Sequence, residues 1–377
     1  MKKILIFIES LAGGGAEKAL VNLVKALNKQ KYDITVMTVT DGDIYQEAIA
    51  KECKYQSFLS VKDYHTGGLK KLLFWLNIKY IYNAPAEDVY RKYIHEKYDI
   101  EIAFIEGFAT KLISASTNNG SKKIAWVHID VLKNSYADKS YKDLNEQINS
   151  YKKYREIVCV SGTVKESFEE KFGINDKASV IHNILDYSDI KDKSDEPTGI
   201  AKAVTPQFIT VGRLEAQKGY PRLLKCLNEL SNEGYEYSFW IIGEGSQKQD
   251  LQQYIHDNHL EGKVQLLGFQ SNPYKYLKQA DAFVCSSYAE GYSTAAIESL
   301  LVNTPVLTVE CSGMHELLDG HAYGEIFSND DQALKIMLEQ AILHPEKLAY
   351  YKTEIEKETD KSRLLGDLAA VERMLDE

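Results

Sequence analysis

The sequence is poor in cysteine. Its 377 residues contain five, which are Cys53, Cys159, Cys226, Cys285 and Cys311. They are scattered, odd in number and include no C-x-x-C pair, which argues against a disulfide framework and against a zinc site. The usage is typical of a reducing compartment, so we expect a cytoplasmic protein.

An excess of positive charge is also lacking. The 45 lysines and arginines are outnumbered by 55 acidic residues, giving a formal net charge of -10. This balance argues against nucleic acid as a partner and against attraction of the whole surface to anionic lipid. Anionic ligands must therefore be held by individually placed residues.

Long apolar runs are missing as well. No segment approaches the roughly 20 apolar residues of a membrane-spanning helix. The run from Ile4 to Ile8 ends at Glu9, well short of the apolar region of a signal peptide. We therefore expect no secretion, and membrane contact that is at most peripheral.

The sequence does contain an alternation of short β-rich runs with helical patterns, typical of a parallel α/β architecture. The chain is longer than one hydrophobic core usually organises, about 250 to 300 residues, so we expect two domains. The predicted strands span 3–8, 33–39, 99–104, 123–127, 156–160 and 179–182, then 207–211, 238–242, 264–267, 282–285 and 306–308.

A polar stretch separates the two series of strands. Between Ile184 and Pro206 the pattern dissolves into Asp, Lys, Ser and Pro, which indicates a linker. We predict an N-terminal domain over 1–188 and a C-terminal domain over 200–359. A C-terminal helix within 360–377 is expected to pack back on the first domain.

The segment from Phe208 to Gly219 carries the strongest chemical signal. It predicts a buried strand that ends at Gly212 and a helix that begins near Gly219, with Arg213 and Lys218 between them. Ligands of open α/β sheets bind at the carboxyl ends of strands, and a guanidinium with an ammonium suits a diphosphate. The alternative is a pair of solvated loop cations.

A second segment, from Ser287 to Glu298, predicts another strand-to-helix turn. Glu290 falls at the turn, where it can hold sugar hydroxyls, and Glu298 falls two turns into the helix, near a ribose. The amides of Gly291, Tyr292, Ser293 and Thr294 at the helix start can cradle phosphate. A glycosidase with paired carboxylates is disfavoured, because one shared helix poorly supplies the geometry that it needs.

Several ordered pieces together resemble family four glycosyltransferases, the retaining group-one enzymes of GT-B fold. The matching pieces are Gly13-Gly-Gly-Ala-Glu17, Trp126-Val-His128, Val160-Ser161, Ile181-His-Asn183, 211–219, Ile242-Gly-Glu-Gly245, Leu267-Gly-Phe269, Glu290 with Glu298, and Ser312-Gly-Met-His-Glu316. Within the family the resemblance is to bacterial capsule, exopolysaccharide and lipid-linked oligosaccharide enzymes. It implies two Rossmann-like domains facing a central cleft, the first binding the acceptor and the second the nucleotide sugar.

Carried over by position, the resemblance assigns roles to individual residues. Arg213 and Lys218 bind the donor pyrophosphate, Glu290 the transferred sugar and Glu298 the ribose. Further donor contacts are implied for Gly14, Gly15, Gly243 and Phe269. A dinucleotide site at the first glycines is disfavoured, because their spacing is not G-x-G-x-x-G.

His128 follows a predicted strand, so it should emerge at the carboxyl edge of the first sheet. The resemblance places it beside the anomeric centre, where it hydrogen-bonds the donor sugar and positions the acceptor. Asp130 and Glu106 are candidates for acceptor contact, and an ordinary loop carboxylate is the alternative for Glu106.

Two other patterns bear on metals and membranes. Asp41-Gly-Asp43 is read as a turn after the second strand rather than as a metal ligand, and we expect neither a metal nor a cofactor. The segment 69–82 mixes apolar, aromatic and lysine residues at helical spacing. It predicts either a helix in a membrane interface or a helix half-buried against the N-terminal sheet.

These expectations combine into one function. We predict transfer of a hexose or N-acetylhexosamine from a UDP-sugar to an acceptor hydroxyl, with retention of configuration, in surface polysaccharide or glycolipid assembly. Two alternatives stay open: a nucleotide-sugar epimerase of the same fold, and a non-catalytic nucleotide-binding partner subunit. Fold alone does not separate them.

Overall fold

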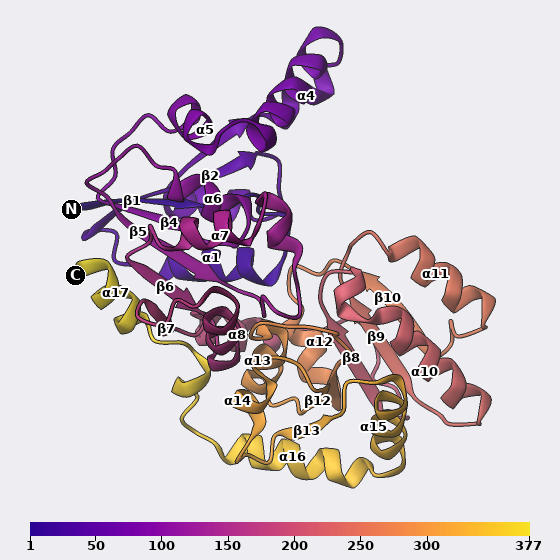
Figure 1. The fold of residues 1–377 in the computed structure, drawn as a ribbon. Helices are drawn as coiled ribbons and strands as arrows, with labels where there is room; N and C mark the ends of the chain where they lie inside the picture. Colours follow the sequence, from indigo (N-terminus) through magenta and orange to yellow (C-terminus); the bar gives the residue numbers. More distant parts are fainter. The chain divides into compact units, whose positions relative to one another are not determined.

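The computed structural model describes all 377 residues and divides the chain into two compact units (Figure 1). Unit 1 comprises residues 1–185 and 366–377, and unit 2 comprises residues 186–365. None of the helices combines the length and the apolar composition that a membrane-spanning segment requires. The stretch expected as a linker contains a helix, α9, which belongs to unit 2 together with the rest of 186–199.

Unit 1 is a seven-stranded parallel sheet with helices. In chain order its elements are β1 (Lys2–Phe7), α1 (Gly15–Ala26), β2 (Tyr32–Thr40), α2 (Gln46–Glu52), β3 (Lys54–Leu59), α3 (Val61–Thr66), α4 (Gly68–Asn83), α5 (Ala86–Tyr93), β4 (Ile100–Ala103), α6 (Phe108–Ser114), β5 (Lys122–Val127), the 3-10 helix η1 (Tyr136–Ser140), α7 (Leu144–Tyr151), β6 (Glu156–Cys159), α8 (Gly162–Phe172), β7 (Ala178–Val180) and α17 (Leu368–Asp376).

Unit 2 repeats this plan with six parallel strands. Its elements are α9 (Tyr187–Ser194), β8 (Gln207–Val211), η2 (Ala216–Lys218), α10 (Tyr220–Asn232), β9 (Ser238–Ile242), α11 (Lys248–Asp257), β10 (Val264–Gly268), α12 (Tyr274–Gln279), β11 (Ala282–Cys285), α13 (Thr294–Leu301), β12 (Val306–Val309), α14 (Met314–Leu318), β13 (Gly324–Phe327), α15 (Asp331–Leu343), α16 (Pro345–Lys357) and η3 (Ser362–Leu364).

Both sheets have the doubly wound strand order. It is β3-β2-β1-β4-β5-β6-β7 in unit 1 and β10-β9-β8-β11-β12-β13 in unit 2. Strand order therefore reverses between β1 and β4 and between β8 and β11, and these switch points are where open α/β sheets bind ligands. The alternation of the sequence predicted this architecture, and all eleven predicted strands are present.

Two strands escaped prediction, β3 (Lys54–Leu59) and β13 (Gly324–Phe327). Both are at the edges of their sheets, and their residues are mostly half-buried. The central strands are more deeply buried. In β1, for example, Ile4, Leu5, Ile6 and Phe7 are all completely buried. A parallel strand that is covered on both faces gives a continuous apolar run, which an edge strand does not need.

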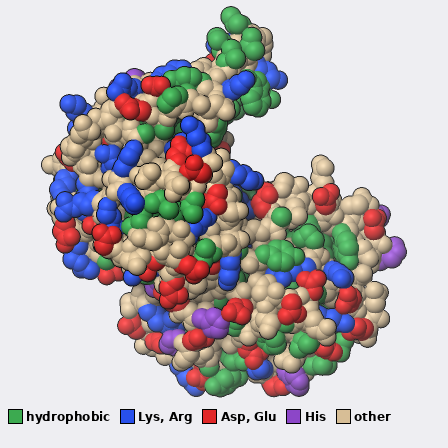
Figure 2. All heavy atoms as spheres, viewed as in Figure 1, with side chains coloured by type: hydrophobic (Ala, Val, Ile, Leu, Met, Phe, Trp, Pro, Cys, Tyr) green, Lys and Arg blue, Asp and Glu red, His purple; other side chains and the backbone are tan.

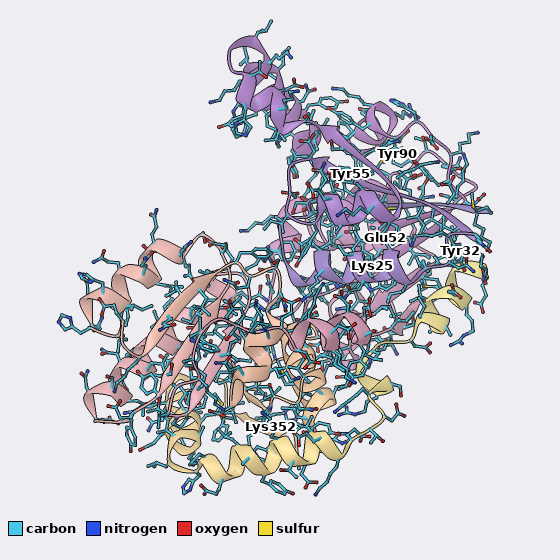
Figure 3. All side chains as sticks on the ribbon, turned by 180° about the vertical axis from the view of Figure 1, so that it is seen from behind. Lys25, Tyr32, Glu52, Tyr55, Tyr90 and Lys352 are labelled. Carbon is cyan, nitrogen blue, oxygen red and sulfur yellow. The ribbon has the colours of Figure 1, made fainter.

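The C-terminal helix α17 packs on unit 1, although the residues that precede it in the chain, 186–365, belong to unit 2. The Tyr32 hydroxyl lies 3.0 Å from Asp376 Oδ1, and Lys122 Nζ donates to the Met374 carbonyl at 2.7 Å. Figure 3 shows Tyr32 beside this helix. Val371 and Leu375 are completely buried, so apolar contact holds the helix in addition to these polar ones.

Candidate active site

The candidate site of unit 2 is built on the loops that follow β8 and β11. These strands are hydrogen-bonded neighbours, with Ala282 opposite Phe208 and Phe283 opposite Ile209. Their loops therefore leave the same edge of the sheet side by side, at the switch point. One loop carries Lys218 and the other Glu290.

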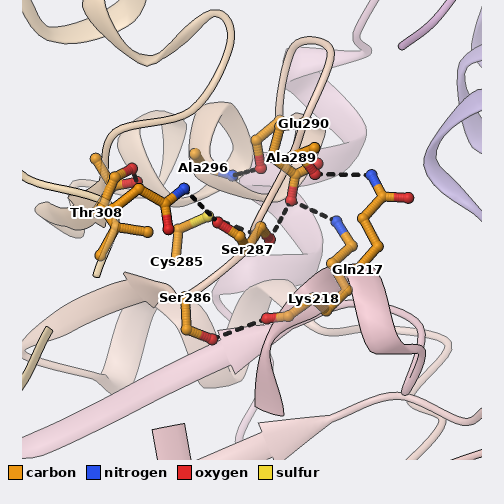
Figure 4. A network of polar contacts seen from close by, with 12 residues as sticks. Gln217, Lys218, Cys285, Ser286, Ser287, Ala289, Glu290, Ala296 and Thr308 are labelled. Carbon is orange, nitrogen blue, oxygen red and sulfur yellow. Dashed lines mark hydrogen bonds and ion pairs between the residues drawn. The ribbon is translucent and has the colours of Figure 1, made fainter. Parts of the chain in front are cut away.

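Lys218 and Glu290 form an ion pair, with Lys218 Nζ 2.6 Å from Glu290 Oε1 (Figure 4). The Ser287 hydroxyl donates to the same oxygen at 2.5 Å. Burial lowers the pKa of Lys218, but the Glu290 carboxylate outweighs it and holds this pKa above its ordinary value. Lys218 is therefore a permanent cation near neutral pH. The sequence predicted both residues at this edge but not their pairing.

Further polar contacts join the two loops. The Gln217 amide donates to the Ala289 carbonyl at 2.7 Å, and the Ser286 hydroxyl donates to the Lys218 carbonyl at 2.9 Å (Figure 4). Backbone bonds add to them, since the Tyr288 amide donates to the Gln217 carbonyl at 2.8 Å. The position of Lys218 relative to Glu290 is thus fixed from several sides.

Two glycines permit a close backbone approach here. At Gly219, where φ is 68°, an added Cβ would lie 2.2 Å from the Ser286 carbonyl oxygen. At Gly243, where φ is 149°, it would lie 1.9 Å from the Gly212 carbonyl oxygen. Both positions combine a backbone conformation that favours glycine with a lack of space. Gly243 was predicted as a donor contact, and the structure gives it this packing role.

Arg213 differs from Lys218 in its surroundings. Its side chain is exposed and forms no ion pair within the chain. Its backbone is held by the neighbouring turn, where the Glu215 amide donates to the Arg213 carbonyl at 2.8 Å. One cation of the predicted pair is therefore locked to Glu290, and the other is available to a ligand. Phe269, on the loop after β10, is also partly exposed.

Helix α13 begins at Thr294, directly after Glu290 to Ser293. The Ser293 hydroxyl accepts from the Ala296 amide at 3.4 Å and so caps the helix. The first amides of a helix have no acceptor within it and favour anions. Gly291, Tyr292, Ser293 and Thr294 are all buried at this end.

Glu298 is the fifth residue of α13, about one turn into the helix. The expectation of two turns was wrong, because the helix begins later than the residue pattern indicated. Its side chain is buried, with 2% exposure.

A small cavity of about 10 Å³ lies at the same sheet edge, with Lys218, Tyr220, Cys285, Ser287 and Glu290 among its lining residues. This is room for about one water molecule. The small size of this cavity shows that the sheet edge is tightly packed beside the ion pair.

The Cys285 thiol lines the same cavity. A hydrogen bond from Cys311 lowers the pKa of this thiol to about 7 despite burial.

In unit 1 the first loop and helix lie at the other switch point. Gly14 is the N-cap of α1 in an extended conformation, and Gly15 is the first helical residue. A Cβ at Gly14 would meet the Glu17 carboxylate at 2.3 Å. Glu17 is buried, so this glycine keeps room for an acidic side chain of the first helical turn.

His128 follows β5 and is buried against Phe104, with ring centroids 4.9 Å apart. Burial lowers its pKa to about 3, so the imidazole is neutral near pH 7. The ring nitrogen Nε2 is buried and has no hydrogen-bond partner within the chain. A neutral ring with an unsatisfied nitrogen is suited to hydrogen-bond a hydroxyl group.

Glu106 contacts the loop that carries His128 through hydrogen bonds. One carboxylate oxygen accepts from the backbone amides of His128 and Ile129, and the other accepts from the Tyr136 hydroxyl at 3.1 Å. Glu106 has no exposed surface, and burial raises its pKa to about 7. The structure thus gives Glu106 the role of holding the His128 loop, while contact with an acceptor stays a prediction.

Asp130 is also largely buried, and its Oδ1 accepts from the amides of Leu132 and Lys133, each at 3.1 Å.

Asp41 and Asp43 hold loops through their side chains. Asp41 Oδ1 accepts from the Val61 amide at 2.6 Å, and Asp43 Oδ2 accepts from the Leu11 amide at 2.7 Å. The two residues lie directly after β2, as the turn prediction required.

Two family models match successive parts of the chain. The model described as Glycosyltransferase Family 4 matches residues 13–189, and the model described as Glycosyl transferases group 1 matches residues 192–358. The chain belongs to the family 4, group 1 glycosyltransferases. The GT-B fold expected from the resemblance is confirmed by the two doubly wound sheets and by the solved structures that the chain resembles.

Relatives of this glycosyltransferase assemble glycans. The chain is 29% identical over 351 residues to the N-acetylgalactosamine-N,N'-diacetylbacillosaminyl-diphospho-undecaprenol 4-alpha-N-acetylgalactosaminyltransferase of Campylobacter jejuni, covering 90% of this chain and 91% of the relative. It is 23% identical to the lipopolysaccharide 1,6-galactosyltransferase of Salmonella typhimurium, covering 86% and 85%. Anabaena HepE, solved in complex with UDP-glucose, has a similar fold with a TM-score of 0.77 at 18% identity, covering 100% and 98%.

Sequence reasoning missed two residues of this glycosyltransferase. Arg222 in α10 is buried, and its guanidinium donates to the Ser286 carbonyl at 2.9 and 2.5 Å and to the Ser287 carbonyl at 3.1 Å, beneath the Tyr288 ring. Glu9, just beyond β1, accepts from the Tyr82 hydroxyl at 3.2 Å, and burial raises its pKa. Arg222 follows Pro221 in the first turn of α10, and nothing in these neighbouring residues indicates that its side chain turns inward. Its role was therefore not predicted.

Proposed function

We propose that this chain is a retaining hexosyl- or N-acetylhexosaminyltransferase that uses a UDP-sugar and acts in surface polysaccharide or glycolipid assembly. The observation that carries the proposal is the Lys218–Glu290 pair, held at a switch point beside an exposed Arg213 and the start of α13. Cationic groups suit a diphosphate, and a carboxylate suits sugar hydroxyls. The site offers both within one hydrogen-bonded cluster.

The leaving diphosphate is the group that this cluster stabilises. When the bond between the anomeric carbon and the β-phosphate oxygen breaks, negative charge develops on that oxygen. Lys218 and the amides at the start of α13 are fixed before this occurs and Arg213 adds a cation at the same edge, so these groups lower the barrier as well as binding the donor. These groups supply the positive charge, and we therefore expect neither a metal nor a cofactor.

Glu290 is placed to hold the transferred sugar. Its Oε1 is occupied by Lys218 and Ser287, while Oε2 makes no hydrogen bond within the chain. That second oxygen is available to accept from sugar hydroxyls. Lys218 thus orients the carboxylate in addition to neutralising phosphate, and the two roles meet in one pair.

The acceptor side of the proposal rests on His128 and on one relative. Neutral His128 cannot serve as a base at its pKa of about 3, so it positions hydroxyl groups. The acceptor proton passes to an oxygen of the leaving phosphate as the new glycosidic bond forms on the same face. The name of the Campylobacter relative specifies a diphospho-undecaprenol substrate, which supports a saccharide on a lipid carrier as the acceptor and a cytoplasmic location where nucleotide sugars are made.

A donor panel tests the proposal. Thermal stabilisation and slow hydrolysis are measured with UDP-glucose, UDP-galactose and their N-acetylamino forms, with GDP- and ADP-sugars as controls. We expect a UDP-sugar to stabilise the protein, release of UDP without added metal, and loss of both effects in Lys218→Ala. Stabilisation by GDP- or ADP-sugars only would contradict the choice of donor. Free epimerised sugar nucleotide would indicate an epimerase instead.

A further inference from the structure

The helical hairpin formed by α3 and α4 carries an unusual surface. Five large apolar side chains of α4 are exposed along its length: Leu69, Leu72, Leu73, Trp75 and Leu76. Helix α4 projects from the rest of unit 1 in Figure 1, and hydrophobic side chains gather there in Figure 2. Scattered surface leucines are ordinary, but a contiguous set of this kind marks an interaction site.

The leucines form one stripe. Positions 69, 72, 73 and 76 follow the spacing that puts residues on a single face of a helix. Helix α4 packs on its unit near its C-terminal end, where Ile81 is buried, and the Phe74 ring lies 5.6 Å from the Tyr64 ring of α3. The leucine stripe lies on the part of the helix that no other element covers.

The charge of the hairpin is opposite to that of the whole chain. Residues 61–83 contain four lysines, Lys62, Lys70, Lys71 and Lys79, against one acidic residue, Asp63, whereas the chain as a whole carries -10. Lysines beside an exposed apolar and aromatic stripe complement a surface that is both apolar and anionic. An anionic bilayer combines an apolar layer and a negative surface everywhere along its plane, so it can contact the stripe and the lysines together.

The base of the same helix reaches the carboxyl edge of the N-terminal sheet. Tyr82 near its end donates to Glu9, which follows β1, and its ring lies 4.9 Å from that of Phe108, which begins α6 after β4. His128 follows β5 at this same edge of the sheet. The stripe therefore begins about 9 Å of helix from Tyr82, at Leu76, and ends about 20 Å from it, at Leu69, at 1.5 Å per residue.

We propose that the α3–α4 hairpin docks the enzyme on an anionic lipid bilayer, with the leucine stripe and Trp75 in the interface and the lysines at the headgroups. Docking would bring the sheet edge that bears His128 close to the bilayer surface. Its purpose rests on the proposed lipid-linked acceptor, but docking itself is a binding property of this surface. Docking can be measured in the absence of both donor and acceptor.

Trp75 provides the direct readout. The chain contains three tryptophans, and Trp126 and Trp240 are buried, at 2% and 1% exposure, whereas Trp75 is 54% exposed. Full-length protein is mixed with vesicles of phosphatidylglycerol and phosphatidylcholine, or of phosphatidylcholine only. We expect a blue shift of emission and quenching by brominated lipid with the anionic vesicles, both absent in Trp75→Phe, and weaker binding at high salt.

Variants then separate the apolar and the charged contributions. Leu72→Ser with Leu73→Ser should lower vesicle affinity more than about tenfold, because two leucines leave the interface. Lys70→Gln with Lys71→Gln and Lys79→Gln should lower it by about fivefold per lysine. Matched controls are Leu343→Ser, at an equally exposed leucine of unit 2, and Lys51→Gln, at an exposed lysine of α2; neither should change affinity.

Three results would overturn the docking proposal: no sedimentation of the wild-type protein with anionic vesicles at low salt, wild-type binding by the leucine variant, or a dimer that forms through the stripe and does not bind vesicles. The leucine variant should keep its melting temperature and its transfer to a water-soluble acceptor. If the proposed function is wrong, wild-type transfer fails while vesicle binding persists. If docking is wrong, transfer persists while binding fails.

Discussion

Lys218 Nζ and Glu290 Oε1 lie 2.6 Å apart, although 72 residues separate them in the chain. The contact joins the residue expected at phosphate to the residue expected at the sugar. Glu290 is 7% exposed, so Lys218 is the cation that compensates a nearly buried carboxylate. Arg213, the other expected phosphate ligand, is exposed and has no such dependence.

Lys218→Ala and Arg213→Ala should therefore differ in stability while agreeing in function. Removing Lys218 leaves a buried carboxylate unpaired and should cost about 3 kcal/mol or more. Removing Arg213 should change stability by less than about 0.5 kcal/mol. Both should lower kcat/KM for transfer by about 10² to 10³. Denaturant unfolding and initial rates test this, and an equal loss of stability in both variants would contradict the structural assignment.

Glu106→Gln should remove the pH dependence of stability that comes from Glu106, while the hydrogen bonds that hold the His128 loop remain. The pKa of Glu106 is raised to about 7 from 4.5, so this group favours folding below about pH 4.5, and its contribution is lost as pH rises through 7. The melting temperature of Glu106→Gln relative to wild type should increase from pH 5 to pH 8. Glu9 retains its own raised pKa in both proteins and cancels in this difference.

Glu106→Ala is the matched disruptive change. It leaves the amides of His128 and Ile129 without their acceptor, at about 1 to 3 kcal/mol each. We expect a loss of stability and a fall in kcat that Glu106→Gln restores in large part. Equal activity of the alanine variant and wild type would show that the His128 loop keeps its position without this carboxylate.

His128 should remain neutral throughout the working range of the enzyme. Its pKa of about 3 lies below the ordinary value of 6.5, so its contribution to stability is present above pH 6.5 and is lost only as pH falls towards 3. NMR of labelled histidine should show one ring that does not titrate between pH 5 and pH 8, and His128→Asn should remove that signal. A His128 signal that titrates near pH 6.5 would exclude the buried, neutral ring.

Gly219→Ala should disrupt unit 2 more than Gly234→Ala. Both glycines have positive φ, 68° and 88°, but a Cβ at Gly234 meets nothing within 4 Å, whereas at Gly219 it would lie 2.2 Å from the Ser286 carbonyl oxygen. The two share a backbone cost of about 1 kcal/mol or slightly more. The additional loss of melting temperature in Gly219→Ala measures the close approach of the two active-site loops. Equal losses would mean that the loops separate easily.

The sequence by itself determined the α/β class, all nine inner strands with two of the four edge strands, β7 and β10, and the sheet edges at which Arg213, Lys218, Glu290 and His128 emerge. It could do so because strands that are covered on both faces must be continuously apolar, and because residues that follow such strands in a parallel sheet share one edge. The half-buried edge strands β3 and β13 lack that signal and were missed. The start of α13 was placed too early, since caps and turns are less distinct than strands.

Only the tertiary structure decided which side chains meet. Lys218 pairs with Glu290, Arg222 turns inward to hold Ser286 and Ser287, and Glu106 receives the amides of the His128 loop. These contacts join residues that lie between 22 and 72 positions apart. Local propensity reports the path of the backbone through a strand or a helix, whereas burial and pairing of a charge depend on what the rest of the chain brings beside it.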